Sequence, residues 1–156
     1  MTQWLSETEQ SAWRSVLRMH SNLMTAMDQT LRTESQMSVS DYEVLVLLSE
    51  APDAELWLRD LRFELRWEAA RLSDRVRCLE ERGLLTRTGG DDGADACVAL
   101  TEAGRDAIDT AAPAHVARVR ELFFDALTEE QVRVLDAAAG AVLENVARLT
   151  NEPGDA

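Results

Sequence analysis

The arginines between residues 65 and 85 are the side chains whose type and spacing point most directly to a chemical role. Arg71 and Arg75 are aligned one helical turn apart, and Arg77 lies on another face of the same predicted helix. Planar guanidinium groups on an exposed helix can pair with guanine edges or phosphates in the major groove of DNA. The opposite face of this helix is expected to be buried through Leu72, Val76 and Leu79.

An ordinary solvated helix face is an equally good interpretation of these arginines from charge alone. Acidic side chains are interspersed among them, namely Glu68, Asp74, Glu80 and Glu81. The whole chain carries a net charge of −13, and all 16 of its basic residues are arginine. Residues 1–39 have a net charge of −1, and residues 40–105 and 106–156 each have −6. No segment is basic overall, so a DNA surface would have to be a local arrangement of arginines.

Other chemistry finds little support in the sequence. Cys78 and Cys97 are too few for a disulfide framework or a metal cluster, and His20 and His115 are too far apart for a helical metal-ligand pair. The chain has no glycine-rich phosphate loop, no His-Glu-x-x-His motif and no nucleophile elbow. We therefore expect no catalytic residues, no metal and no cofactor, and catalysis is the least favoured class of function.

Capping patterns and apolar periodicity predict the elements that position the arginines. Capping boxes are predicted for Ser6 with Glu9, Ser40 with Glu43 and Thr128 with Gln131, and a simpler N-cap for Thr101. Gly83 is expected to end the helix that carries the arginines, and Pro113 to kink or divide a later one. Helices are predicted over about 7–31, 41–48, 58–65, 68–82, 101–126 and 129–149, with a β-hairpin from strands 84–88 and 96–100.

This order predicts a mainly α fold with a small β-hairpin wing, a winged helix-turn-helix flanked by N- and C-terminal dimerisation helices. The predicted divisions are a helical dimerisation segment at 1–39, a DNA-binding lobe at 40–105, a second dimerisation segment at 106–150 and a disordered tail at 151–156. The flanking helices are too apolar to remain exposed to solvent, so we expect them to pair in a homodimer, although they could instead pack against the chain's own core. No apolar run approaches the ~20 residues that span a bilayer and no signal peptide is evident, which predicts a cytoplasmic protein.

The segment from Leu65 to Leu85 resembles the recognition helix of the multiple-antibiotic-resistance regulator (MarR) family. Residues 80–85, Glu-Glu-Arg-Gly-Leu-Leu, are similar to that family's Leu-Glu-x-x-Gly-Leu-Val ending. Residues 100–104 match its Leu-Thr-x-x-Gly signature after the wing, and residues 127–131 match the start of its last helix. Trp67-Glu68 followed by Arg71-Leu72-Ser73 resembles an actinobacterial branch of the family. The resemblance covers nearly the whole chain in the right order.

The resemblance implies a dimeric, sequence-specific regulator, usually a repressor, that binds a pseudo-palindromic operator in double-stranded DNA. Arg71 and Arg75 are predicted to contact the groove or phosphates, with further DNA contacts at Arg66, Trp67, Ala69, Arg77 and Arg87. A pocket for a small aromatic effector is the family's usual regulatory site. Its predicted lining is Trp13, His20, Met24 and Phe63, although an ordinary packed core residue is the favoured interpretation of each.

Two departures from the family pattern predict weaker or more salt-sensitive DNA binding. The family's wing usually carries an arginine in Asp-x-Arg, whereas the matching positions here are Asp92-Gly93-Ala94. Asp74 also stands where relatives usually have a basic or neutral polar residue. Acids near phosphates add repulsion to binding that depends on phosphate neutralisation. A degenerate member that has lost DNA binding and acts through protein contacts is therefore the alternative. Neither cysteine lies near the first helix, where oxidant-sensing relatives place theirs, so no redox switch is predicted.

Overall fold

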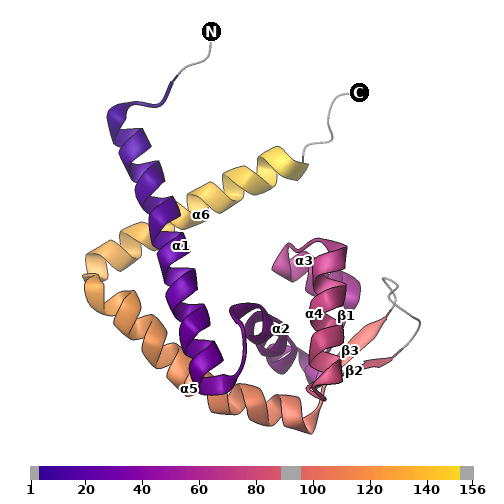
Figure 1. Ribbon diagram of the computed structural model, residues 1–156. Helices are drawn as coiled ribbons and strands as arrows, with labels where there is room; N and C mark the ends of the chain where they lie inside the picture. The colour runs from indigo at the N-terminus through magenta and orange to yellow at the C-terminus, as the bar shows by residue number, and fades with distance from the viewer. Residues whose placement is uncertain (1–3, 89–95, 152–156) are drawn as a thin grey trace, which may run out of the picture. The chain divides into compact units, whose positions relative to one another are not determined.

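The computed structural model describes residues 4–88 and 96–151 (Figure 1). The chain divides into two compact units. The first unit extends to Arg118 and the second begins at Val119. The first helix, α1, spans Glu7–Ser35 and begins at the predicted capping box. The Glu9 amide donates to Ser6 Oγ at 3.3 Å, and the Ser6 amide donates to Glu9 Oε2 at 2.7 Å. The helix therefore starts where the sequence predicts and runs about one turn further than expected.

The second helix, α2, spans Val39–Glu50, and its predicted cap is wrong. The capping box is formed by Ser38 with Asp41 instead of Ser40 with Glu43. The Asp41 amide donates to Ser38 Oγ at 3.0 Å, and the Ser38 amide donates to Asp41 Oδ2 at 2.8 Å. Both pairs fit the broader Ser/Thr-x-x-Asp/Glu form of the capping box. Ser38 prevails because the Asp41 carboxylate is also held by two arginines from later in the chain, which favours the earlier start.

A helix-turn-helix follows the short 3₁₀ turn at Pro52–Ala54. Helix α3 spans Leu58–Leu65 and α4 spans Ala69–Glu81, within a residue of the predicted ranges. Between them Arg66 has a left-handed backbone with φ of 55°, which costs a non-glycine residue about 1–2 kcal/mol. At the end of α4, Gly83 has φ of 72°, as its predicted role requires. The Leu84 amide beyond it donates to the Leu79 carbonyl at 3.0 Å.

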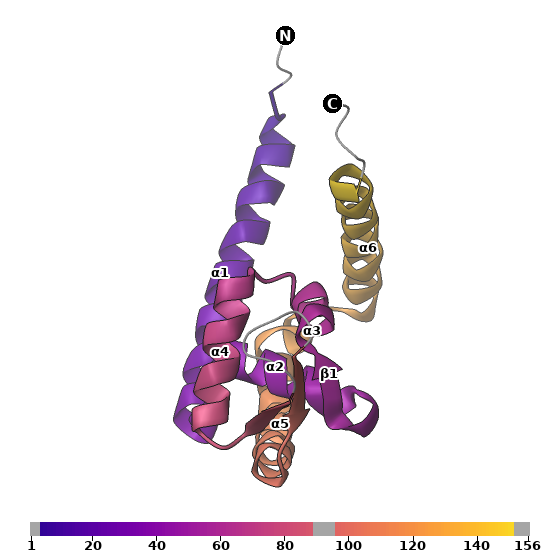
Figure 2. The same cartoon turned by 90° about the vertical axis from the view of Figure 1, so that its right-hand side faces the viewer.

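The sheet has three antiparallel strands, one more than the predicted hairpin. Strands β2, Leu85–Thr88, and β3, Cys97–Leu100, pair as expected. The sequence analysis missed β1, Glu55–Trp57, which pairs with β3 on its other side and gives the order β1-β3-β2. Figure 2 shows α4 on the β2 side of the sheet and β1 at the opposite edge. The turn predicted at 89–93 lies outside the described residues.

Helix α5 spans Glu102–Leu122, and its start is fixed to the base of the wing. The Gly104 amide donates to Thr101 Oγ1 at 2.9 Å, which confirms the predicted N-cap. Pro113 lies inside α5 and does not divide it. The His115 ring stacks on Tyr42 of α2 with 4.1 Å between centroids, and burial lowers the pKa of this histidine.

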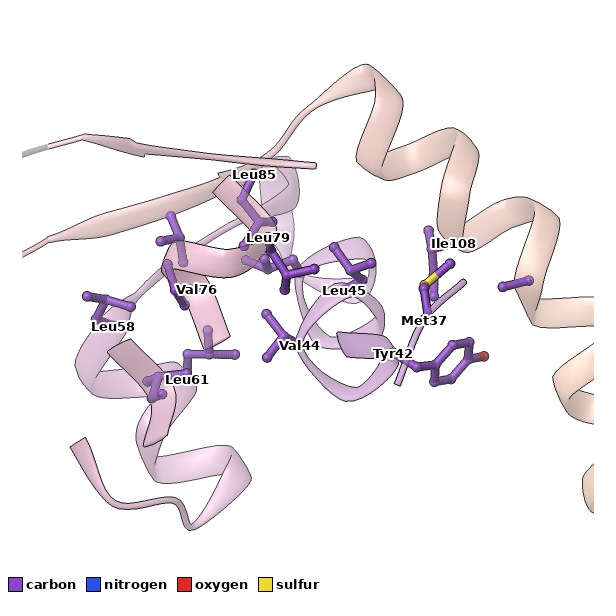
Figure 3. Close-up of a cluster of buried hydrophobic side chains, with 14 of the residues drawn as sticks. Met37, Tyr42, Val44, Leu45, Leu58, Leu61, Val76, Leu79, Leu85 and Ile108 are labelled. Carbon is purple, nitrogen blue, oxygen red and sulfur yellow. The ribbon is translucent and has the colours of Figure 1, made fainter. Parts of the chain in front are cut away.

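Buried side chains from α1, α2, α3, α4, the sheet and α5 share one core in the first unit (Figure 3). The predicted buried face of α4 is confirmed, since its three apolar side chains are at most 3% exposed. The largest fully buried side chains are Leu31, Leu45, Leu48, Leu61, Leu79, Leu85, Val44, Val76 and Val98. This arrangement confirms the predicted winged helix-turn-helix fold, and the shared core holds α4 rigidly at the surface.

The second unit contains a 3₁₀ turn at Phe124–Ala126 and helix α6, Glu129–Asn151. The Gln131 amide donates to Thr128 Oγ1 at 3.2 Å, which confirms the third predicted capping box. Residues 130–150 of α6 include no fully buried side chain. Its exposed apolar residues are Val134, Val142, Leu143, Val146 and Leu149. Among the described residues, no helix is long and apolar enough to cross a membrane.

Candidate nucleic-acid interface

The exposed surface of α4 is organised by its helical period. Ala70, Asp74, Arg77 and Glu81 are spaced at i, i+4, i+7 and i+11, and all four are exposed. They therefore form an outward stripe on the side of α4 away from its buried face. Arg71 and Arg75, the predicted contact residues, lie on the flank of the helix. The sequence analysis named Arg77 from this stripe but missed Ala70 as part of it.

Arg71 is exposed near the N-terminal end of α4 and is lightly held there. One guanidinium nitrogen donates to Ser40 Oγ of α2 at 3.1 Å. The guanidinium carbon also lies 4.0 Å from the ring centroid of Trp67, a cation–π contact. No carboxylate within ion-pair distance of Arg71 appears among the described residues. This arginine therefore keeps a fixed direction without being neutralised.

Arg75 is placed differently from the prediction of a free groove contact. Its guanidinium donates to Asp41 Oδ1 at 3.0 Å, and the same carboxylate accepts from Arg82 at 3.2 Å. The Asp41 side chain is only 5% exposed, whereas both arginine side chains are 35% exposed. A DNA contact by Arg75 would require the loss of this buried ion pair. The predicted contact stays a prediction, and the geometry first assigns Arg75 a structural partner.

Two further predicted arginines also have acidic partners. Arg77 donates to Asp74 at 2.6 Å one turn back on the outward stripe, and both side chains are more than half exposed. Arg87 of β2 lies 3.4 Å from Glu80, with its side chain only 13% exposed. The wing positions 92–94, where the family arginine is missing, lie outside the described residues. The arginines around α4 therefore do not make an unopposed positive surface.

Helix α3 adds an arginine row that the sequence analysis overlooked apart from Arg66. Arg59, Arg62 and Arg66 follow i, i+3, i+7 spacing and are all exposed. The Arg66 guanidinium lies 4.2 Å from the Phe63 ring centroid, and that of Arg59 lies 5.2 Å from the Trp57 ring. These aromatic rings are 60% and 43% exposed. The signal for this row was the helical spacing of arginines in 59–66.

A pocket of about 630 Å³ lies between α1, α2 and the start of α4. Of the four predicted lining residues, His20 and Met24 line it, together with Trp67 and Arg71. Trp13 lies two turns before His20 on α1 and is 57% exposed, and Phe63 stacks under Arg66 on α3, so neither lines the pocket. The sequence analysis missed the α2 and α4 walls because their approach to α1 is a tertiary feature.

Two carboxyl groups of this pocket, Glu43 and Asp28, have shifted pKa values. Burial raises the pKa of Glu43, although the charge of Arg71 opposes the shift. The pKa of Asp28 is lowered by its hydrogen bond with Arg32 and by the Val39 amide, which donates to it at 2.9 Å. Asp28 therefore joins the end of α1 to the start of α2. The pocket offers an aromatic wall at Trp67 and a guanidinium at Arg71.

The cysteines give no sign of a metal site or a reactive pair. The Cys97 thiol is buried, donates to Glu55 Oε1 at 2.9 Å, and has its pKa raised to about 11 by burial and by that carboxylate. Cys78 is half-buried on α4. No cluster of His, Cys, Asp or Glu suited to a metal ion occurs in the part of the chain that the structure describes.

The helix-turn-helix, its three-stranded wing and the exposed α4 define a winged helix-turn-helix protein. The MarR family transcriptional regulator AbsC from Streptomyces coelicolor is 32% identical, with a TM-score of 0.85 over 93% of this chain and 98% of AbsC. The chain belongs to the MarR family of transcriptional regulators, which confirms the predicted resemblance.

Two further structures share this architecture. Sco3205, a MarR family transcriptional regulator from Streptomyces coelicolor crystallised in complex with DNA, is 30% identical, with a TM-score of 0.85 over 97% of this chain and 96% of that one. The S. aureus MepR–DNA complex shares the fold at 20% identity, with a TM-score of 0.71 over 84% and 94% of the two chains. No family sequence model and no curated protein sequence matches the chain.

Proposed function

We propose that this regulator binds double-stranded DNA, with the N-terminal half of α4 in the major groove. The observation that carries the proposal is the position of Arg71, which is exposed on the flank of a helix whose buried face is anchored in the core. Recognition helices of helix-turn-helix proteins contact base edges through their N-terminal residues. A relative of 30% identity with a TM-score of 0.85 was crystallised in complex with DNA, which supports DNA binding by this chain.

The proposed contact residues differ in the interactions that each must break before it can contact DNA. Arg71 exchanges one hydrogen bond to a hydroxyl, worth about 1 kcal/mol, for a charge-assisted bond to DNA. Arg66 and the α3 row are placed to meet the phosphate backbone. Trp67 supports the Arg71 guanidinium, and the small side chain of Ala69 lets the backbone approach closely. Arg75, Arg77 and Arg87 must first leave a carboxylate, as must Arg59 of the α3 row, so we expect these four to contribute less.

We also propose that two copies of the chain pair through exposed apolar faces of α1 and α6. Trp13 and Leu17 on α1 and Val142 and Val146 on α6 are each 49–62% exposed. Contiguous apolar faces of this kind normally mark an interface. A two-fold pair would present two α4 helices to half-sites about 34 Å apart on a pseudo-palindromic operator. Such a DNA-bound protein works in the cytoplasm, as the sequence predicts.

A repressor role with relief by a small aromatic effector is the regulatory part of the proposal. The pocket bordered by His20, Met24 and Trp67 offers one aromatic ring and two aliphatic side chains among mainly polar groups, which would suit an aromatic molecule that also carries polar or charged substituents. Arg71 also lines this pocket. A bound effector would therefore contact the arginine that we assign to DNA, and occupation of the pocket and of the operator would be coupled.

Selection from a random-sequence duplex library tests the DNA-binding proposal. The duplexes need about 30 base pairs to hold two half-sites about one turn apart. We expect the wild-type protein to enrich a pseudo-palindrome, and Arg71→Ala to weaken binding to it by at least about tenfold. Arg133→Ala, which removes an equal charge from an exposed position on α6, is the matched control and should bind as the wild type does. If no duplex is retained even at low salt, the protein-contact alternative is favoured.

A further inference from the structure

Asp41 is a buried carboxylate at which three parts of the first unit meet. It lies in the first turn of α2, where Oδ2 accepts from the Ser38 amide at 2.8 Å and from Arg82 at 3.2 Å. Its other oxygen, Oδ1, accepts from Arg75 in the middle of α4 at 3.0 Å. Arg82 extends the connection, because its second nitrogen donates to the Gln36 carbonyl at the end of α1 at 2.9 Å. One side chain thus joins the α1–α2 junction to α4 at two points.

The local electrostatics keep this carboxylate charged. Burial alone would raise the pKa of Asp41, but hydrogen bonds from the backbone and side chain of Ser38 and the charge of Arg75 together lower it below its ordinary value. A buried carboxylate with two guanidinium partners is expensive to separate from them. The two ion pairs are also directional, since Oδ1 accepts from Arg75 and Oδ2 accepts from Arg82. The cluster therefore restrains both the rotation and the tilt of α4.

We propose that Asp41 is a positioning residue that determines how well the protein distinguishes its operator from other DNA. The inference rests on the proposed function and adds two physical consequences to it. The carboxylate fixes the direction in which α4 presents Arg71 and the outward stripe. It also withholds Arg75 and Arg82 from phosphates, which carry no sequence information and contribute to non-specific binding.

The substitution Asp41→Asn separates these effects from simple unfolding. An asparagine oxygen can still accept from the Ser38 amide, so the cap of α2 is kept. The amide nitrogen, however, would face a guanidinium donor, and the arginine charges would no longer be balanced. Because the Arg75 and Arg82 side chains are already 35% exposed, both can turn outward to water or to phosphate. The expected result is a folded protein with a looser α4 and two more available cations.

The test compares binding to the selected pseudo-palindrome with binding to a shuffled duplex of the same composition, across a salt series. For Asp41→Asn we expect the ratio of specific to non-specific affinity to fall about tenfold, the discrimination of roughly one bidentate base contact. Non-specific binding should tighten, and its logarithmic salt dependence should steepen by about 0.9 for each added phosphate contact. A purely structural loss would weaken both kinds of binding together.

Asp60→Asn is the matched control, because it neutralises an exposed aspartate 3.7 Å from Arg59 in the same lobe. It should raise both affinities and leave their ratio unchanged. If Asp41→Asn fails to fold, Arg82→Gln replaces it and should also lower the ratio, since Arg82 follows the last residue of α4. If the ratio of specific to non-specific affinity is the same in Asp41→Asn or Arg82→Gln as in Asp60→Asn, the inference is overturned, although the proposed function stands. A wild-type protein that binds neither duplex overturns both.

Discussion

Gly104→Ala is the substitution whose cost can be worked most directly from the structure. A Cβ atom at Gly104 would lie 2.1 Å from the Leu84 carbonyl oxygen and 2.8 Å from Leu100 Cδ1. An ordinary carbon–oxygen contact is about 3.3 Å, so the Leu84 backbone would have to retreat by roughly 1 Å. That carbonyl also accepts from the Thr101 amide at 3.1 Å. The clash would therefore disturb the Leu84 carbonyl, which connects the start of the wing to the start of α5 through its bond with the Thr101 amide.

The magnitude follows from two contributions. Overpacking at a rigid site costs about 1–3 kcal/mol, and a lost hydrogen bond adds about 1 kcal/mol. For a chain of this length each kcal/mol lowers the melting temperature by about 2–4 °C, so we expect a decrease of roughly 10 °C. Circular dichroism melting at one fixed protein concentration measures it, because association would make the midpoint concentration-dependent.

Gly140→Ala is the internal control for this experiment. Gly140 lies in α6, and a Cβ atom there would meet nothing within 4 Å. Alanine is favoured over glycine inside a helix by about 0.5–1 kcal/mol, so this variant should melt slightly higher than the wild type. If Gly104→Ala melts like the wild type, the close approach of α5 to Leu84 is not a feature of the protein, and our account of how the wing is held is wrong.

Two further predictions concern proton binding. The pKa of Asp41 is lower in the folded state than the ordinary value near 3.9, so the stability that this carboxylate contributes is present above about pH 4 and is lost as the pH falls through the folded-state pKa. The difference in melting temperature between the wild type and Asp41→Asn should therefore shrink in acid. A difference that stays constant with pH would contradict this account. Because the pKa of Cys97 is raised to about 11, this buried thiol should stay protonated near pH 8 and react with iodoacetamide much more slowly than half-buried Cys78. Mass mapping of the alkylated peptides distinguishes the two cysteines. Equal reaction rates would contradict the burial and raised pKa of Cys97.

Local sequence signals predicted most of the fold, since the deciding interactions lie within a few residues. The capping box at Ser6, the left-handed Gly83 and the buried stripe of α4 are examples. The prediction at Ser40 failed because two overlapping capping patterns are equivalent locally, and distant arginines select between them. Strand β1 was missed because three residues carry no periodicity and become a strand only through pairing with β3.

The candidate site was less predictable, because its properties depend on which side chains meet. The sequence indicates arginines one turn apart in α4 but not that Arg75 is held by Asp41, 34 positions earlier. It likewise places His20 and Met24 on one stripe without revealing that Trp67 and Arg71 complete the pocket. The dimer, the operator contacts and the pocket's role remain predictions, because each depends on a partner outside this chain.

The acidic composition affects DNA binding through these same local pairs more than through net charge. At about 0.1 M salt the screening length is roughly 10 Å, so acids on distant helices have little influence at the face of α4. Asp74 is different, because it lies on the outward stripe beside Arg77. When Arg77 turns to a phosphate, it leaves an unbalanced carboxylate close to the same backbone, and the pair neutralises almost nothing. We therefore expect phosphate neutralisation to come mainly from Arg71 and Arg66, because the Arg71 guanidinium contacts the Ser40 hydroxyl and the Trp67 ring and that of Arg66 lies over the Phe63 ring. Arg59 of the α3 row lies 3.7 Å from Asp60, so its contribution depends on that acid.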